Sequence, residues 1–145
     1  MANPAKIKFK IVTPNGVIFD DEIDALTIPT ASGEITVLPG HIPLISILVA
    51  GELIARRDGV EIPMSVSGGI VEVRPNNELS VLAETAERAE HIDLDRAEAA
   101  RQRAWELMQR QKFVDDVEFV RVAAKLEKEL ARLRVGRKYR KLNRP

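Results

Sequence analysis

The side chains that most often carry chemistry are few in this chain, and they are not spaced as a catalytic or metal site. The two histidines, His41 and His91, have no cluster of carboxylates at the spacing of metal ligands, and no cysteine is present to act as a nucleophile or thiolate ligand. Ser67-Gly68-Gly69 is better explained as a tight connection between strands than as an oxyanion loop. There is no P-loop and no dinucleotide fingerprint. We therefore expect an interaction protein without an active site, a metal or a required cofactor.

The stretch from Ser32 to Leu44 is the best candidate for a binding surface. Pro39 and Pro43 fix φ, while Gly40 can adopt a positive φ without steric cost, so a stiff loop is predicted here. A stiff loop between two strands can present a surface to a partner. The alternative is a turn that only connects two buried strands, with His41 in a local hydrogen bond.

The C-terminal end carries a run of cations and no acid. Its Lys and Arg residues are Arg132, Arg134, Arg137, Lys138, Arg140, Lys141 and Arg144. Such a run is typical of a solvated helix end, which the helix dipole favours. Nucleic acid is a possible ligand electrostatically, but Tyr139 is the only nearby aromatic residue and no nucleic-acid-binding motif is present. A protein partner with an acidic surface explains the run at least as well.

The charge divides the 145 residues into two modules. Residues 1–91 carry 7 Lys and Arg against 13 Asp and Glu, whereas residues 92–145 carry 15 against 9. No apolar run approaches the length of a membrane span, and the first residues lack the apolar core of a signal peptide. We expect a soluble chain that reaches a membrane only through a partner.

The acidic module, residues 1–91, has the pattern of an all-β domain, with many short strands separated by turn signals. This spacing favours a sandwich or a barrel. The expected strands cover residues 6–11, 17–19, 25–28, 34–37, 44–49, 52–55, 60–66, 69–73 and 79–83.

The basic module, residues 92–145, is predicted to form two helices, at about 94–111 and 116–137. Asp95 and Asp115 each stand three residues before a Glu, which is a capping-box-like start. The short link favours an antiparallel hairpin, so the whole chain is an α+β protein. Because isolated helices of this length are marginal in water, the pair must pack on something else.

The order of several motifs resembles the epsilon subunit of bacterial F-type ATP synthases over essentially the whole chain. The motifs are Val12-Thr13-Pro14, Val17-Ile18-Phe19, Gly33-Glu34-Ile35, Leu38-Pro39-Gly40-His41-Ile42-Pro43-Leu44, Val66-Ser67-Gly68-Gly69-Ile70-Val71-Glu72-Val73, Leu82-Ala83-Glu84-Thr85-Ala86-Glu87 and Leu133-Arg134-Val135. The family more often has Asp where Glu84 stands, and the tail beyond Val135 is longer and more basic than in many members.

This resemblance implies a non-catalytic rotor subunit of the central stalk, peripheral on the cytoplasmic face of the bacterial cell membrane. A β-sandwich would contact the gamma subunit and the polar loops of the membrane c-ring, so that rotation is coupled to the catalytic head. The residues that match the region of these contacts are Gly33, Glu34, Gly40, His41 and Pro43.

The family's helical hairpin is a switch. It is compact on the sandwich or extended into the alpha/beta head, where it inhibits ATP hydrolysis. The hinge is expected near residues 87–91. The cations expected to make the inhibitory contact are Arg132, Arg134, Arg137 and Lys138.

Regulatory ATP is the one ligand that the resemblance suggests. The run from Ile92 to Ala97 matches an Ile/Leu-Asp-x-x-Arg-Ala motif with which some members bind ATP and hold the hairpin compact. The matching positions are Glu87, Ile92, Asp93, Arg96, Ala97, Lys128 and Arg132. Lys128 stands where the ATP binders have Arg, which replaces a planar fork by a point charge. The alternative is that Asp93 only caps a helix and Arg96 forms a surface ion pair.

Two other classes of function stay open at this stage. A free-standing interaction scaffold would use the acidic sandwich to bind something other than a rotor. A nucleic-acid binder would depend on the basic tail and show steeply salt-dependent binding.

Overall fold

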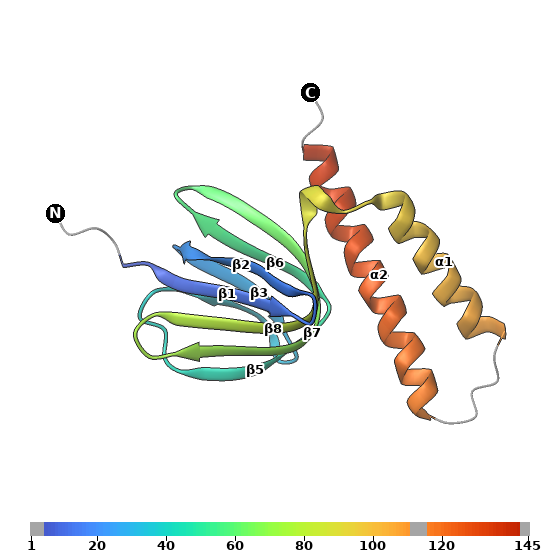
Figure 1. The fold of residues 1–145 in the computed structure, drawn as a ribbon, viewed down its shortest axis with the longest axis horizontal. Coiled ribbons are helices and arrows are strands. Elements are labelled where there is room, and N and C mark those ends of the chain that lie inside the picture. Colours follow the sequence, from blue (N-terminus) through green and yellow to red (C-terminus); the bar gives the residue numbers. More distant parts are fainter. Residues whose placement is uncertain (1–4, 111–115, 143–145) are drawn as a thin grey trace.

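The computed structural model describes residues 5–110 and 116–142, and it consists of a β-domain followed by two helices (Figure 1). The strands are β1 (Ile7–Thr13), β2 (Gly16–Ile23), β3 (Ala25–Thr30), β4 (Gly33–Val37), β5 (Leu44–Leu48), β6 (Gly51–Arg57), β7 (Val60–Arg74) and β8 (Glu78–Arg88). A single 3-10 turn, η1 (Ala89–His91), leads to the helices α1 (Leu94–Arg110) and α2 (Asp116–Leu142). The predicted fold class, a β-sandwich followed by two helices, is confirmed.

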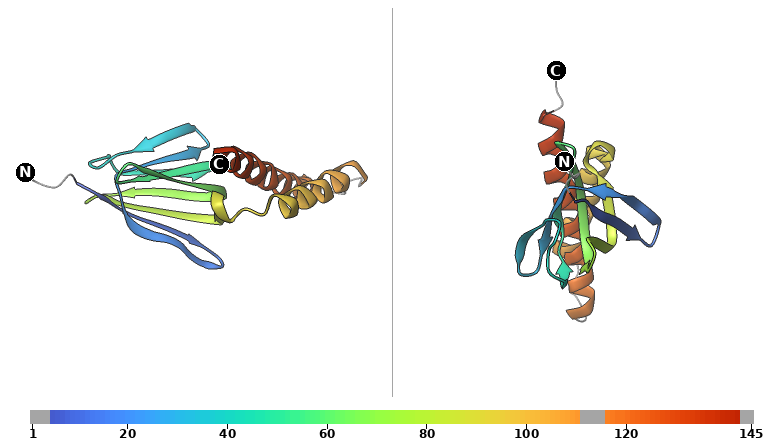
Figure 2. Two further views of the ribbon diagram at one scale, coloured as in Figure 1. Left: turned by 90° about the horizontal axis from the view of Figure 1, so that it is seen from above. Right: turned by 90° about the vertical axis from the view of Figure 1, so that its left-hand side faces the viewer.

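The sandwich is one hydrogen-bonded sheet that folds over into two layers (Figure 2). Its strands follow the order β2-β1-β8-β7-β5-β3-β4, and β6 pairs with both β3 and β7. Most neighbours are antiparallel, whereas β1 and β8 pair in parallel. This parallel pair joins the first and last strands of the domain, and β6 closes the other part of the sheet by bridging β3 and β7.

The long strand β7 takes part in both layers because it bends at two glycines. Its first half pairs with β6 and its second half with β5. Gly68 and Gly69 have φ values of +46° and +141°, which bend the strand without reversing it. The predicted turn between separate strands at 60–66 and 69–73 is therefore wrong. A Cβ on Gly69 would lie 1.9 Å from the Leu82 carbonyl oxygen, so only glycine fits there.

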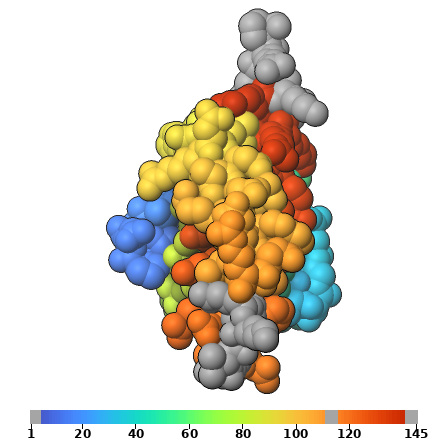
Figure 3. All heavy atoms as spheres, turned by 90° about the vertical axis from the view of Figure 1, so that its right-hand side faces the viewer, coloured from blue at the N-terminus to red at the C-terminus, as the bar shows by residue number. Residues whose placement is uncertain are grey.

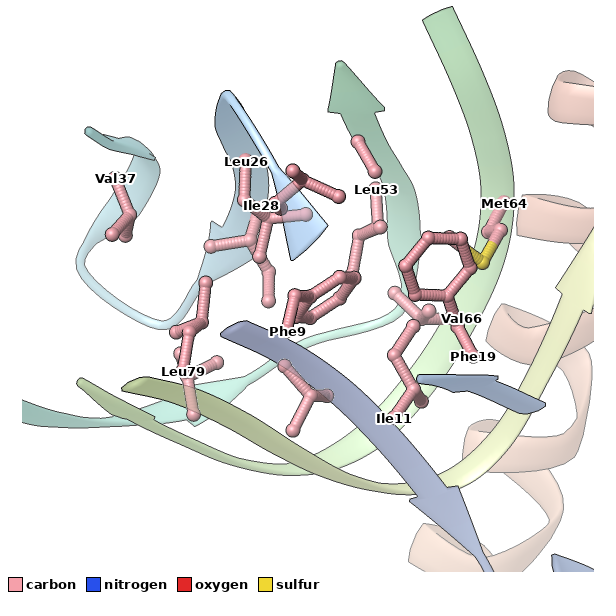
Figure 4. Close-up of a cluster of buried hydrophobic side chains, with 14 of the residues drawn as sticks. Phe9, Ile11, Phe19, Leu26, Ile28, Val37, Leu53, Met64, Val66 and Leu79 are labelled. Carbon is pink, nitrogen blue, oxygen red and sulfur yellow. The ribbon is translucent and has the colours of Figure 1, made fainter. Parts of the chain in front are cut away.

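The core lies between the two layers, where the labelled side chains of Figure 4 point toward one another. Phe9 and Phe19 pack with their ring centroids 5.3 Å apart, and Phe9 is only 1% exposed. The core residues come from all eight strands, and none comes from the helices. Because burial of apolar side chains is the main stabilising term, the sandwich has its own source of stability.

The hairpin packs at one end of the sandwich, with α2 between the sandwich and α1 (Figures 1 and 3). A second and much smaller apolar cluster joins the parts. It contains Ala89, Ile92 and Val135, with Leu94 and Tyr139 packed against them. The attachment therefore combines this small apolar cluster with ion pairs between α2 and the sandwich.

Helix α1 begins at Leu94 as expected, but its cap lies two residues earlier than the capping pattern indicated. The Asp93 carboxylate accepts a hydrogen bond from the Arg96 backbone N–H (3.0 Å), so Asp93 is the cap. The prediction of Asp95 as the cap is wrong. Asp95 lies in the first turn, where its charge still suits the helix dipole. The other predicted cap, Asp115, lies outside the described residues.

Candidate functional site

The stiff loop predicted around His41 is a short connection between β4 and β5. The Gly40 N–H donates to the Asn77 side-chain oxygen (2.7 Å), which ties the loop to the turn between β7 and β8. Within the loop, the His41 N–H donates to the Leu38 carbonyl (3.1 Å), and the His41 ring hydrogen-bonds the Ile42 carbonyl. The local hydrogen bond considered for His41 is therefore present, and the loop is braced in two places.

The structure separates the five residues predicted for the gamma and c-ring contact into two groups. Gly33 and Glu34 begin β4, whereas Gly40, His41 and Pro43 follow its other end. The strand between them covers roughly 15 Å.

The Gly33 end of β4 is the one near the hairpin. Gly33 pairs with Thr30, Thr30 pairs with Leu48, and the next two residues, Val49 and Ala50, line a groove against α2. The His41 end lies beside the turn between β7 and β8, away from the hairpin.

A row of exposed apolar side chains crosses three neighbouring strands of the sandwich. Ile47 of β5 pairs with Ile70 of β7, and Ile70 pairs with Leu82 of β8. These three side chains are 63%, 48% and 54% exposed, and Ile45, two residues before Ile47, is 71% exposed. We call these four residues the apolar row. Contiguous exposed apolar surface of this kind marks an interaction site.

The apolar row is not among the residues predicted from the sequence, although the sequence contains one signal for it. A sandwich strand with one solvated face should alternate apolar and polar residues. The run from Leu44 to Val49 has only Ser46 as a polar residue. Near-continuous apolar character is typical of a strand that is covered on both faces, whereas Ile45 and Ile47 of β5 are exposed in this chain.

A charge cluster joins α2 to the end of β8. Arg132 donates to Glu87 of β8 (2.8 Å) and to Glu129 one turn earlier in α2 (2.9 Å). The Glu129 side chain is only 8% exposed and that of Arg132 is 18% exposed. Burial alone would lower the pKa of Arg132, but its hydrogen bonds to Glu87 and Glu129 raise that pKa above its ordinary value. The cluster is therefore a partly buried attachment in which the Arg132 guanidinium stays charged.

The other cations predicted for the inhibitory contact differ in their surroundings. Arg137 donates to Glu98 of α1 (3.0 Å), and Lys138 donates to both oxygens of Glu52 of β6 (3.0 Å each). Arg134 is exposed and lines the groove between α2 and the sandwich. In this compact arrangement, three of the four predicted cations, counting Arg132, are paired with acids of the same chain.

The residues predicted to bind ATP also differ in their surroundings. Glu87, Lys128 and Arg132 line one small pocket of about 190 Å³. Ile92 and Ala97 are buried at 7% and 0% exposure, so they pack rather than face a ligand.

The two polar residues of the ATP motif, Asp93 and Arg96, do not line this pocket. Asp93 caps α1, as the simpler alternative had it, and Arg96 is exposed. Small-molecule sites usually measure about 300–1,000 Å³, so the pocket is too small for a nucleotide as it stands. A larger groove of about 880 Å³ lies beside it and shares Lys128 and Thr85.

Two family models divide the chain close to the start of η1. Residues 6–89 match the ATP synthase delta/epsilon chain β-sandwich domain, and residues 90–136 match the delta/epsilon chain long α-helix domain. The chain belongs to the ATP synthase epsilon-chain family. Within the described residues, no helix of this epsilon-family chain is long and apolar enough to cross a bilayer.

Relatives and solved structures agree with this assignment. The chain is 42% identical over 131 residues to the ATP synthase epsilon chain of Bacillus licheniformis, covering 90% of this chain and 98% of the relative. It is 44% identical over 111 residues to that of Bacillus subtilis, covering 77% and 83%.

The fold also occurs in a chain of the Euglena gracilis mitochondrial ATP synthase, OSCP/F1/c-ring. That match has a TM-score of 0.72 at 23% identity and covers 90% of this chain and 81% of the other. A chain of the Tetrahymena thermophila mitochondrial ATP synthase central stalk and c-ring matches with a TM-score of 0.58 at 14% identity, covering 95% and 98%. The chain is thus an accessory subunit of the ATP synthase by family, and ATP synthesis and ion transport follow as the process it serves.

Proposed function

We propose that this chain is a rotor subunit in the central stalk of a proton-translocating F-type ATP synthase. It would couple c-ring rotation to the catalytic head and restrain ATP hydrolysis through its helical hairpin. The observation that carries the proposal is the division of the chain into a sandwich whose core contains no helix residue and a hairpin joined to it by a small apolar cluster and ion pairs. The sandwich can stay docked while the hairpin moves. The complex would hold the chain peripherally on the cytoplasmic face of the bacterial cell membrane.

The apolar row is the proposed docking surface for the gamma subunit. Ile47, Ile70 and Leu82 are each about half exposed, so burying the rest of each side chain would contribute about 1 kcal/mol. They stand on hydrogen-bonded strands, so little conformational entropy is lost on docking. A rigid apolar surface suits a contact that must transmit torque.

The two ends of β4 are proposed to serve two partners. Because Glu34 and His41 lie at opposite ends of the strand, one end would contact the gamma subunit and the other the polar loops of the c-ring. Both ends are braced. The Gly40 N–H is bonded to Asn77, and the Thr30 hydroxyl donates to the Gly33 carbonyl (2.6 Å). Cross-linking from Glu34→Cys or His41→Cys tests this, since the chain has no other cysteine.

The hairpin is proposed to inhibit hydrolysis when it leaves the sandwich. Release would free Arg132 and Lys138 from Glu87 and Glu52, so the same cations could meet acidic surface on the head. Moving such an equilibrium from 1:99 to 99:1 takes a difference of about 5.5 kcal/mol between the two states. A few ion pairs and a small apolar cluster together contribute a free energy of this order.

ATP is proposed as a ligand that biases this equilibrium. Lys128 and Arg132 would offer cations to the phosphates, and the groove beside them has room for the rest of a nucleotide. Binding would compete with the Arg132–Glu87 ion pair, which already satisfies the guanidinium. We therefore expect weak affinity, which calorimetry with ATP on the full chain and on Arg132→Gln would measure.

The regulatory part is tested by ATP hydrolysis of a catalytic head depleted of its epsilon subunit. Either the full chain or residues 1–91 is added back. We expect both to bind and only the full chain to suppress turnover. Equal turnover with both would leave a coupling role without inhibition, and absence of binding by either would refute the proposed function as a whole.

A further inference from the structure

The last turns of α2 fasten its end to two other elements. Arg137 donates to Glu98 of α1, and Lys138 donates to Glu52 of β6, each at 3.0 Å. The Tyr139 hydroxyl also donates to Glu52. These three residues follow residue 136, where the match to the family's helix domain ends.

The position of Tyr139 makes this contact more than a surface ion pair. Its ring packs on the small cluster of Ala89, Ile92 and Val135, which lies where the chain leaves the sandwich and enters the hairpin. The same ring lines a pocket of about 520 Å³ between η1 and the hairpin of β6 and β7. One side chain thus contacts the sandwich, the link and the hairpin together.

The close approach of α2 to this junction depends on Gly136. A Cβ at this position would lie 2.6 Å from Leu94 Cδ2 and 3.1 Å from Ile92 Cγ2. The glycine lets α2 come near the start of α1 just before the chain reaches Lys138 and Tyr139. The next turn of α2, which carries Lys138 and Tyr139, therefore lies close to β6.

Glu52 is well placed to receive both donors. It lies on β6, opposite Ser65 of β7, and its side chain is only 23% exposed. Its carboxylate accepts two hydrogen bonds from the Lys138 ammonium and one from the Tyr139 phenol, and such charge-assisted bonds are stronger than neutral ones. A strand residue held in the sheet is a fixed point against which α2 can be held.

We propose that Lys138 and Tyr139 act on Glu52 as a latch that holds the hairpin against the sandwich. The residues after 136 then set how often the hairpin is compact. The inference rests on the proposed mobility of the hairpin and adds the contact that controls it. Because hydrogen bonds to charged groups contribute more than neutral ones, removing the latch should raise the ratio of released to compact chains about tenfold.

Spin-label distances on the full chain test the latch. The chain has no cysteine, so Lys10→Cys on β1 and Arg103→Cys on α1, both at exposed positions, carry the only two labels. We expect Glu52→Gln to raise the ratio of long to short distances about tenfold. The double variant Lys138→Gln/Tyr139→Phe, which leaves the sandwich unaltered, should give the same increase.

The matched control is Glu72→Gln. This substitution removes a carboxylate on β7 that accepts a hydrogen bond from Arg74 (3.0 Å). It should leave the spin-label distances unchanged. The latch is refuted if both Glu52→Gln and the double variant keep the parent distances, or if the control shifts them equally. Circular dichroism checks that each variant is folded.

Failure of the latch and failure of the proposed function give different results. If the variants release the hairpin but the full chain never suppresses ATP hydrolysis, the latch stands and the regulatory function is wrong. If the chain suppresses hydrolysis but the variants keep the parent distances and the parent inhibition, the function stands and the latch is wrong.

Discussion

Removing Arg132 should destabilise the attachment of the hairpin far more than removing an arginine from a more exposed ion pair. The change Arg132→Met keeps much of the side-chain volume but leaves Glu129, at 8% exposure, without its guanidinium. Breaking a buried ion pair typically costs about 3–5 kcal/mol. Lys128 Nζ remains 3.6 Å from Glu129 and partly compensates, so we expect a loss of about 2 kcal/mol.

The assay is urea denaturation followed by two probes. Fluorescence of Trp105, the single tryptophan, reports α1, and circular dichroism reports the whole chain. The Trp105 transition should move to lower urea in Arg132→Met. The control, Arg101→Met, removes a more exposed ion pair to Glu98 within α1, whose side chains are 27% and 42% exposed, and should shift it much less.

A double variant tests the physical reason. If the cost arises from an uncompensated charge on Glu129, then Arg132→Met/Glu129→Gln should recover part of the loss. The reasoning is refuted if the double variant is no more stable than Arg132→Met, or if Arg132→Met behaves like Arg101→Met.

Three further outcomes follow from the geometry. Gly69→Ala should destabilise the sandwich by at least about 3 kcal/mol in chemical denaturation, because of the positive φ and the contact with the Leu82 carbonyl; unchanged stability would contradict the bend. Ile47→Ser/Leu82→Ser should weaken binding to the gamma subunit about thirtyfold without lowering chain stability. The control Val17→Ser changes a similarly exposed residue on β2 and should not weaken this binding. Burial, and then the bond to Glu52, raises the pKa of Tyr139 to about 12. Since the neutral phenol is the form favoured in the folded chain, its contribution to docking is complete below pH 10 and is lost as the pH rises from 10 to about 12. Absorbance titration of this single tyrosine checks the value, and a pKa near 10 in the parent chain would count against the contact.

Much of the fold could be predicted because local signals agree with it. Alternating residues, such as those of β1, and turn signals predicted the position of most strands. Both helices begin at the expected residues, but the predicted end of α2 at Arg137 is wrong, because the helix continues to Leu142. The bend of β7 could not be predicted. Gly68-Gly69 is equally consistent with a turn and with a bent strand, and only the pairing with β8 on both sides of the bend distinguishes them.

The faces of α2 were harder to predict than its length. The expected stripe included Phe119 and Leu133, but Phe119 is 45% exposed whereas Leu133 is buried. Buried positions such as Val122, Ala131 and Val135 lie on more than one side of the helix because α2 packs on α1 and on the sandwich. A single hydrophobic stripe assumes a single neighbour, and this helix has two.

The candidate site depended on contacts between residues far apart in sequence. The cations of the tail were visible as a run, but their partners Glu52, Glu87 and Glu98 carry no local signal that pairs them with it. The apolar row likewise requires the register of β5, β7 and β8. The sequence pattern indicates which residues are apolar, but only the pairing of the strands determines which of them are neighbours.

The most direct test of a rotor role is ATP-driven proton uptake by membrane vesicles that hold an ATP synthase depleted of its epsilon subunit. Adding the full chain should restore proton uptake per ATP hydrolysed, and Ile47→Ser/Leu82→Ser should restore much less at the same concentration. Uptake that is unchanged by the chain, although the chain binds, would contradict a role in coupling rotation to catalysis.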